Sequence, residues 1–194
     1  MRRTILCSIA SLVVGLSVSA QTTWIADKAH SQVTFSVTHL LITEVTGRFR
    51  DFDITFQNAN DDFSEGSIDI RIGAASIDTD IEKRDNHLRS DDFLNAEKFP
   101  NITFKSKSIE KMGKNTYKIT GVLTIRDVTK SVVLDATYNG TVTDPWGVTK
   151  AGFKATTAIN RFDYGVKWNK VMETGGLVAG ETVKIILLVE FNKQ

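Results

Sequence analysis

The chain has 194 residues, and its 24 basic and 23 acidic side chains give a formal net charge of +1. This near balance provides no electrostatic footprint for nucleic acid or for an anionic membrane. The length is enough for one domain with a sizeable core, and no low-complexity run or Gly/Ser linker marks a place to divide the chain.

The first twenty residues have the pattern of a secretory signal peptide. Arg2 and Arg3 precede an apolar run over residues 5–18, and small residues end the segment at Ala20. We expect a signal peptide of residues 1–20 cleaved after Ala20, a mature domain of residues 21–194, and a periplasmic or secreted protein. The apolar run is short and interrupted by Ser and Gly, so stable membrane insertion is not expected; an uncleaved anchor is the alternative.

The only cysteine, Cys7, lies in this segment. The mature domain therefore has no disulfide, no thiolate nucleophile and no cysteine metal ligand. Its stability must come from a hydrophobic core.

After a lead-in over residues 24–29, alternating apolar and polar residues predict a series of short strands. The expected strands cover residues 32–39, 50–56, 66–72, 102–104, 117–125, 132–138, 153–159 and 183–191. A turn is expected at 44–47, and loops are expected at 58–65 and 160–180. Phe49 falls on the wrong parity for the strand that follows it, which predicts a bulge or a second apolar contact there.

One polar segment interrupts this pattern. Its residues recur at steps of three and four, at Arg84, His87, Leu88, Asp91 and Asn95. On a helix this spacing places a cation, an imidazole and a carboxylate on one face, and Pro100 then ends the helical pattern. The segment predicts a short helical insertion between strands three and four.

Eight strands joined mostly by short turns predict an all-β fold, an eight-stranded antiparallel up-and-down barrel. The interior of such a barrel is either just filled by side chains or able to hold one small or slender ligand. Gly121, Ala155 and Thr157 are small residues in the inward rows and would leave room, whereas a filled core is the alternative.

Six motifs together resemble the YceI-like family, and their order and spacing match from about Trp24 to Phe191. The motifs are Asp27-x-x-His30-Ser31-x-Val33-x-Phe35-x-Val37-x-His39, Gly47-x-Phe49-x-x-Phe52, Arg84-Asp85-x-His87-Leu88-x-x-x-Asp92-Phe93, Phe99-Pro100-x-Ile102-x-Phe104, Gly121-x-Leu123-Thr124-Ile125 and Arg161-x-Asp163-x-Gly165. One departure is Asp127, at a turn position where the family commonly has Gly; Asp also tolerates left-handed turn geometry.

The resemblance implies an extended lipocalin-like barrel, usually exported in bacteria and often a homodimer, that encloses a long polyisoprenoid, quinone tail or fatty chain. The expected partner is therefore a long-chain isoprenoid or fatty amphiphile, and no cofactor is expected. The expected function is an exported carrier that sequesters this amphiphile inside the barrel. The alternative is a non-enzymatic stress-protective or protein-interaction barrel with a filled core.

The candidate ligand contacts are Phe35, His39, Phe49, Phe52, Arg84, His87, Phe93, Phe104, Arg161 and Trp168. The phenylalanines would line a hydrocarbon tunnel, or else they are plain core residues. His39 would bond a head-group oxygen at the mouth, or else the backbone satisfies it. Arg84 has donors suited to a carboxylate or phosphate, and Arg161 and Asp163 could meet it across the barrel end. The alternative is an Arg–Asp network that only ties the helix to the loop expected at residues 160–180, called the late loop below.

A metal site and an active site are only weakly indicated. The candidate metal ligands are His30, His39, His87, Asp27, Asp85 and Asp91, and they lack the spacing of a metal-binding motif. The sequence also lacks a nucleophile-elbow motif and a glycine-rich phosphate loop, so an enzyme is not expected. A metal-dependent hydrolase at the barrel mouth is the third hypothesis.

Overall fold

The computed structural model describes residues 21–194 apart from 61 and 174, so the predicted signal peptide and Cys7 lie outside the described residues. The strands are β1 (Thr22–Ala26), β2 (Gln32–His39), β3 (Thr43–Phe49), β4 (Phe52–Asn58), β5 (Gly66–Gly73), β6 (Ile77–Asp78), β7 (Asn101–Lys111), β8 (Thr116–Ile125), β9 (Val128–Thr143), β10 (Thr149–Asn160) and β11 (Ala179–Lys193). The helices are α1 (Glu82–Arg89) and the short 3₁₀ helices η1 (Ala74–Ser76) and η2 (Arg161–Tyr164). None of the described helices is long and apolar enough to cross a membrane.

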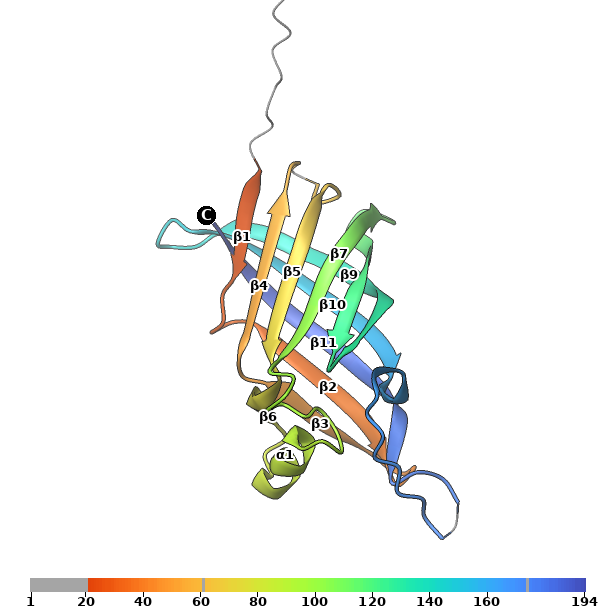
Figure 1. Cartoon of the computed structure of the whole chain (residues 1–194). Helices are drawn as coiled ribbons and strands as arrows, with labels where there is room; N and C mark the ends of the chain where they lie inside the picture. The colour runs from red at the N-terminus through yellow and green to blue at the C-terminus, as the bar shows by residue number, and fades with distance from the viewer. Residues whose placement is uncertain (1–20, 61, 174) are drawn as a thin grey trace, which may run out of the picture.

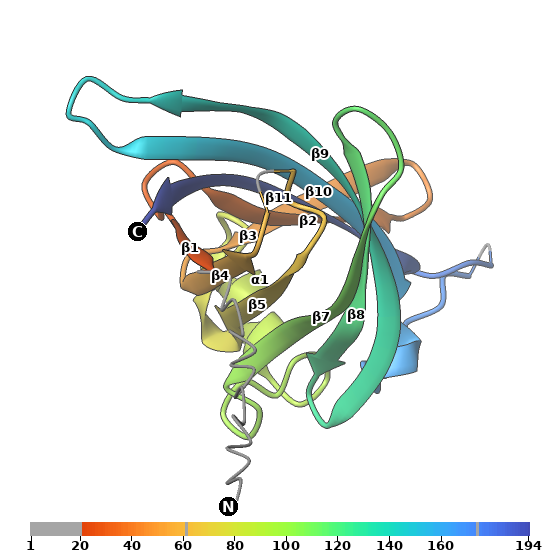
Figure 2. The same cartoon turned by 90° about the horizontal axis from the view of Figure 1, so that it is seen from above.

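The strands form one antiparallel sheet that closes on itself into an elongated barrel (Figure 1, Figure 2). Closure joins the first and last strands, where Trp24 in β1 lies opposite Lys193 in β11. β1 and β2 pair with successive parts of β11, and β3 and β4 follow them as one interrupted strand. β6 adds only a short pairing to β3. The described segments therefore make eight barrel strands, which confirms the predicted all-β, eight-stranded antiparallel barrel.

The chain between β2 and β3 turns at residues 40–42. The turn predicted at 44–47 is wrong, because those residues lie within β3. Leu40 and Leu41 have φ values of 51° and 64°, a left-handed conformation that leucine rarely adopts. Gly47 has a packing role in the strand, because a Cβ at this position would meet the ring of Phe35.

The parity change at Phe49 comes from an interruption of the strand. Phe49 ends β3 and Phe52 begins β4, with Arg50 and Asp51 between them. The interruption changes the strand partners, since β3 pairs with β2 whereas β4 pairs with β1 and β5. A break therefore stands where a bulge was predicted, and the alternative, a second apolar contact, is present, since the ring centroid of Phe49 lies 5.7 Å from that of Phe35.

α1 lies in the connection from β5 to β7, after η1 and β6, at the lower end of the barrel in Figure 1. The helix ends at Arg89, so the prediction that Asp91 and Asn95 lie on its face is wrong. Ser90 has an extended backbone, and its hydroxyl donates to the His87 carbonyl oxygen over 2.7 Å. Ser and Asp compete with helical hydrogen bonds in this way, which explains the early end of the helix.

Aromatic side chains pack together around β1, the end of β4 and the loop after β4, elements that lie at the upper end of the barrel in Figure 1. The ring centroid of Phe63, from the loop after β4, lies 5.7, 5.8 and 5.3 Å from those of Trp24, Phe56 and Phe153. Phe191 lies 6.2 Å from Phe56 and 6.0 Å from Phe153. We call these five residues the aromatic plug. Because Phe63 is only 7% exposed, the loop folds inward and closes this end.

Candidate functional site

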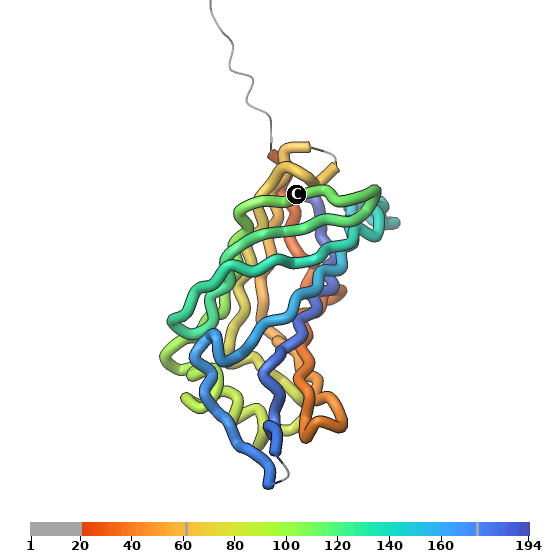
Figure 3. The backbone as a smooth tube through the Cα atoms, turned by 90° about the vertical axis from the view of Figure 1, so that its right-hand side faces the viewer, coloured from red at the N-terminus to blue at the C-terminus, as the bar shows by residue number. Residues whose placement is uncertain are grey.

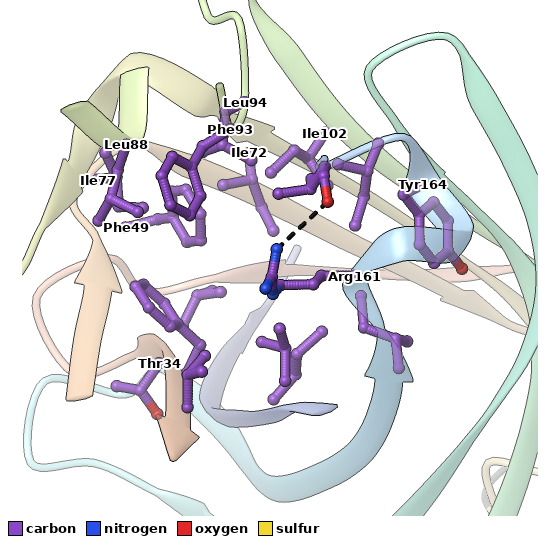
Figure 4. Close-up of a pocket in the computed structure, with 18 of the residues that line it drawn as sticks. Thr34, Phe49, Ile72, Ile77, Leu88, Phe93, Leu94, Ile102, Arg161 and Tyr164 are labelled. Atoms are coloured by element: carbon purple, nitrogen blue, oxygen red, sulfur yellow. Dashed lines mark hydrogen bonds between the residues drawn. The ribbon is translucent and has the colours of Figure 1, made fainter. Parts of the chain in front are cut away.

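An apolar cavity of about 310 Å³ lies inside the half of the barrel that α1 approaches (Figure 4). Most of its lining is aliphatic, for example Ile72, Ile102 and Leu123 from β5, β7 and β8. The described lining includes two arginines, Arg84 and Arg161, and no carboxylate. Small-molecule sites commonly measure about 300–1,000 Å³, with apolar walls and a few polar groups, so this cavity has the size and chemistry of a ligand site.

The lining contains the predicted ligand residues with the exception of Phe52. Those present are Phe35, His39, Phe49, Arg84, His87, Phe93, Phe104, Arg161 and Trp168. Phe52 is 4% exposed and lies in the hydrophobic core, where side chains of the neighbouring strands cover it. Among the described residues it is therefore a packing residue and not part of the cavity wall.

Small inward residues were expected to leave room inside the barrel, and only one of them does so. Thr157 lines the cavity. The space beside Gly121 is taken by the ring of Phe104, which a Cβ on Gly121 would meet. Ala155 packs against the hydrophobic core and is outside the lining that the described residues form.

The late loop contributes part of the wall that sequence periodicity missed. Tyr164, Val166 and Val178 line the cavity, although residues 160–180 show no alternation. Tyr164 is 2% exposed, and burial raises the pKa of its hydroxyl. The family resemblance placed Arg161 and Trp168 of this loop among the ligand contacts, but no pattern in the sequence marks these three residues.

Arg161 braces the late loop against the barrel (Figure 4). Its Nη1 donates to the Trp168 and Val166 carbonyls over 2.7 and 3.3 Å, its Nε to the Gly180 carbonyl over 2.8 Å, and its Nη2 to the Ala179 carbonyl over 3.1 Å. The side chain is 5% exposed, and burial lowers the pKa of Arg161 because desolvation disfavours the charged form. Asp163 pairs with Lys130 at 3.0 Å. The predicted contacts of Arg161 and Asp163 with Arg84 across the barrel end are thus not formed among the described residues, and carbonyl oxygens hold Arg161.

Arg84 and Asp85 both bind Thr79, in the segment before α1. Arg84 donates from Nε to Thr79 Oγ1 and from Nη2 to the Thr79 carbonyl, both over 2.7 Å. The Asp85 carboxylate accepts from the Thr79 N–H over 2.9 Å and from Thr79 Oγ1 over 2.5 Å. Asp85 is 5% exposed and fixes the helix, whereas Arg84 lines the cavity. Nη1 of Arg84 makes no hydrogen bond with the described residues, so this cation has donors available to a ligand.

His87, Phe93 and Trp168 form an aromatic cluster at the cavity mouth, with ring centroids 5.0, 5.8 and 5.5 Å apart. His87 Nε2 lies 2.8 Å from Asp92 Oδ2, and the His87 side chain is 43% exposed. His39, at the end of β2, lines the same mouth and lies opposite Ala179 of β11. His87 and His39 therefore lie together on the cavity lining, whereas Arg161 is buried.

Arg126 holds the turn between β8 and β9. Its Nη1 donates to the carbonyls of Asp91, Phe93 and Gly165 over 2.9, 2.9 and 3.2 Å. The left-handed residue of this turn is Arg126, with a φ of 57°, so the expectation of this geometry at Asp127 was displaced by one residue. The turn thereby ties the segment after α1 to the late loop.

The candidate metal ligands, which lack motif spacing in the sequence, lie in separate parts of the structure, and of them only Asp27 and His30 form a described group of possible ligands. His39 and His87 line the cavity, whereas His30 lies with Asp27 and Glu190 near the opposite end of β11. The ammonium of Lys150 lies 3.2 Å from Asp27 Oδ2 and 2.8 Å from Glu190 Oε1. A protein cation thus already occupies the point where these carboxylates meet.

This charged cluster makes the free energy of unfolding depend on pH in the acid range. The hydrogen bond with His30, together with bonds from Ala29 and Lys150, lowers the pKa of Asp27 from 3.8 to about 2. A carboxylate with a lowered folded-state pKa stabilises the protein above about pH 4, and this contribution is lost as the pH falls through about 2. Asp27→Asn is expected to remove about 1 kcal/mol of stability at neutral pH and to flatten the acid dependence. Urea unfolding from pH 7 to pH 2 measures both effects.

The matched control is Asp163→Asn, which removes only the exposed ion pair with Lys130. Its stability is expected to stay within about 0.5 kcal/mol of the parent protein at every pH. An Asp27→Asn variant with the parent's acid dependence would contradict the assignment.

These features define a closed antiparallel β-barrel with an apolar internal cavity whose lining includes two arginines and two histidines. The domain model described as YceI-like matches residues 24–191, and the chain belongs to this family. A relative named UPF0312 protein from Shewanella denitrificans is 40% identical over 197 residues, with all of both chains covered. A UPF0312 protein from Staphylococcus aureus is 37% identical over 167 residues, covering 86% of this chain and 95% of its own.

Solved structures share the fold. A YceI protein from Campylobacter jejuni is 34% identical with a TM-score of 0.69, covering 81% of this chain and 90% of its own. A polyisoprenoid binding domain from Saccharophagus degradans, implicated in plant cell wall breakdown, is 13% identical with a TM-score of 0.63, covering 89% of this chain and 98% of its own. The second likeness concerns the fold alone.

Proposed function

We propose that this protein is an exported carrier that sequesters a long-chain amphiphile, such as a polyisoprenoid, quinone tail or fatty-acid derivative, with its tail in the barrel. The observation that carries the proposal is the apolar cavity of about 310 Å³ with cationic and imidazole side chains in its lining. The S. degradans domain described as polyisoprenoid binding has the same fold, but the argument rests on the cavity of this chain. Export through the signal peptide and a homodimer are parts of the same proposal.

The tail supplies most of the binding energy in this arrangement. Burial of each CH₂ group is worth roughly 0.8 kcal/mol, and the aliphatic wall offers no polar competitor to a hydrocarbon. Head groups would be distinguished more weakly, by Arg84, His87 and His39 at the mouth. Affinity should therefore rise with chain length more steeply than it changes with head-group chemistry.

The decisive experiment identifies what the protein carries. Protein purified from its own host is expected to retain a hydrophobic small molecule, visible as added mass in native mass spectrometry and recovered by organic extraction. Protein that carries no such molecule and also takes up no prenyl or fatty chain would overturn the proposal. The cavity speaks against a filled interaction barrel.

Arg84 provides a second test, because its position separates head-group recognition from bracing. Arg84→Ala is expected to lower the preference for a fatty acid over the alcohol of the same length by about tenfold, since one cation at the mouth is lost. The loss of two hydrogen bonds to Thr79 should cost about 1–2 kcal/mol of stability. Competition binding with the acid and the alcohol measures the preference, and urea unfolding measures the stability.

Lys83→Ala is the control, since Lys83 is an exposed neighbour of Arg84 on α1 that lies outside the cavity lining. It should change neither quantity appreciably. If Arg84→Ala loses stability but keeps the parent's preference for the acid, Arg84 braces the helix and does not recognise the head group.

A further inference from the structure

We propose that the barrel takes up and releases its ligand while docked on a lipid bilayer through an apolar tip beside the cavity mouth. The tip consists of Leu40, Leu41 and Ile42 from the β2–β3 turn and Val171 from the late loop. This inference rests on the proposed function, to which it adds the surface that supplies the ligand.

The tip exposes large apolar side chains to solvent. Leu40 is 37% exposed, Leu41 64%, Ile42 85% and Val171 60%. The two loops lie side by side at the lower end of the barrel (Figure 3), where the Leu40 N–H donates to the Val178 carbonyl over 2.9 Å. Clustered exposed apolar residues of this kind mark an interaction surface, whereas isolated ones do not.

The backbone holds this surface outward at an energetic cost. Leu40 and Leu41 both have positive φ values, which non-glycine residues adopt only when the surroundings enforce them. The hydrogen bonds from Leu40 to Val178 and from Ile42 to His39 fix the turn in this shape. Two consecutive leucines in an unfavourable conformation, with exposed side chains, suit a role outside the barrel core.

The tip is continuous with the cavity. His39 and Val178 line the cavity and are direct chain or hydrogen-bond neighbours of Leu40. The aromatic plug closes the opposite end, so a hydrocarbon tail passes through the mouth. A tail that leaves a bilayer beside the tip enters the barrel without exposing its methylene groups to water, which is the costly step of transfer.

Charges around the tip suit a phospholipid surface. Lys167 and Lys170 are exposed in the same loop as Val171. The acidic residue in the stretch 167–173 is Glu173. Glu44, in β3 just after the other loop, is paired with Lys184 at 2.5 Å. Basic side chains next to a shallow apolar patch are the combination that binds the headgroup region, so a bilayer fits the tip better than an acidic protein surface does.

The chain also contains an apolar residue that serves as a matched control. Trp146, in the turn between β9 and β10, is 85% exposed, the same as Ile42. That hairpin projects at the other end of the molecule, beside β1 and the C-terminus (Figure 1, Figure 2). Trp146 therefore tests whether any exposed apolar side chain binds lipid or whether only the mouth does.

The experiment compares the parent protein, the double variant Leu41→Glu/Ile42→Glu, the single variant Val171→Glu and the control Trp146→Glu. All are expressed from the full-length sequence, and intact mass establishes that their N-termini are identical. Flotation measures association with vesicles of phosphatidylcholine alone or mixed with an equal amount of phosphatidylglycerol. The double variant is expected to lose at least about tenfold in vesicle partitioning, because two side chains would bring charge into the bilayer boundary. Val171→Glu should lose less, and Trp146→Glu should match the parent.

Two further measurements keep the outcomes distinct. Binding of a soluble short-chain fluorescent fatty acid tests the cavity without vesicles, and the double variant should bind it as the parent does. Transfer of a long-chain probe from vesicles should speed up with vesicle concentration for the parent and slow by about tenfold in the double variant. If the parent protein does not associate with vesicles, or if Trp146→Glu loses as much association as the double variant, the proposal of a docking tip is wrong. The proposal that the protein is a carrier then still stands. If the parent protein and every variant fail to bind the soluble probe, the proposal that the protein is a carrier is wrong.

Discussion

Replacing Arg161 with methionine is expected to lower the free energy of unfolding by about 3 kcal/mol. The substitution removes the donors that now bind the carbonyls of Val166, Trp168, Ala179 and Gly180. Each buried carbonyl that loses its hydrogen-bond partner costs about 1–3 kcal/mol of stability. Removal of the buried charge also removes its desolvation cost, which offsets part of this loss. Urea unfolding followed by circular dichroism measures the change.

Two companion variants separate the carbonyl bonds from charge alone. Arg161→Lys keeps a cation but not the planar set of donors, so its loss should be intermediate. Lys130→Met breaks only the exposed pair with Asp163 and should stay within about 0.5 kcal/mol of the parent. An Arg161→Met variant with parental stability and lost ligand binding would make Arg161 a ligand contact and not a brace.

Filling the cavity is expected to abolish its function without unfolding the protein. Thr157→Trp places an indole in the lumen from β10, next to Ile185 of β11, which also lines the cavity. Affinity for a long-chain fatty acid should fall by at least about 100-fold, which corresponds to the loss of three or four buried CH₂ groups. Overpacking normally costs about 1–3 kcal/mol, but the vacant lumen should keep this cost low.

Thr156→Trp is the matched control. Thr156 is the preceding residue of the same strand, and successive strand residues point to opposite faces, so its side chain lies outside the lumen. The same change of residue there should leave fatty-acid binding unaltered in a fluorescence titration. If Thr157→Trp binds the chain as tightly as Thr156→Trp does, the ligand lies somewhere other than this cavity.

The barrel could be predicted from the sequence because alternation reports directly on which residues face a core. The inward-facing rows predicted for the strands, such as the row that ends in His39 and the row that contains Phe104, include most of the lining residues. The same logic failed at Phe49, where an interruption that changes strand partners looks like a bulge along one strand. Alternation is a property of one stretch of sequence, whereas the pairing of strands depends on residues elsewhere in the chain.

The contacts that shape the mouth could not be predicted either. The alternative of an Arg–Asp network did not include Thr79, which Arg84 binds, and Arg161 binds backbone carbonyls that have no sequence signature. The inward fold of Phe63 was hidden in a polar loop. Arg84 and Thr79 are only five residues apart, and Arg161 and Trp168 only seven, but these contacts follow from the shape of irregular backbone, which leaves no periodic pattern in the sequence.

The pairing of β1 with β11 joins residues near the two ends of the described chain, Trp24 and Lys193. The sheet therefore stays open until the last strand is available, and contacts this far apart in sequence form slowly. A chain that emerges from a ribosome or a translocation channel N-terminus first cannot complete the barrel early. Its folding is therefore delayed until the whole chain is free.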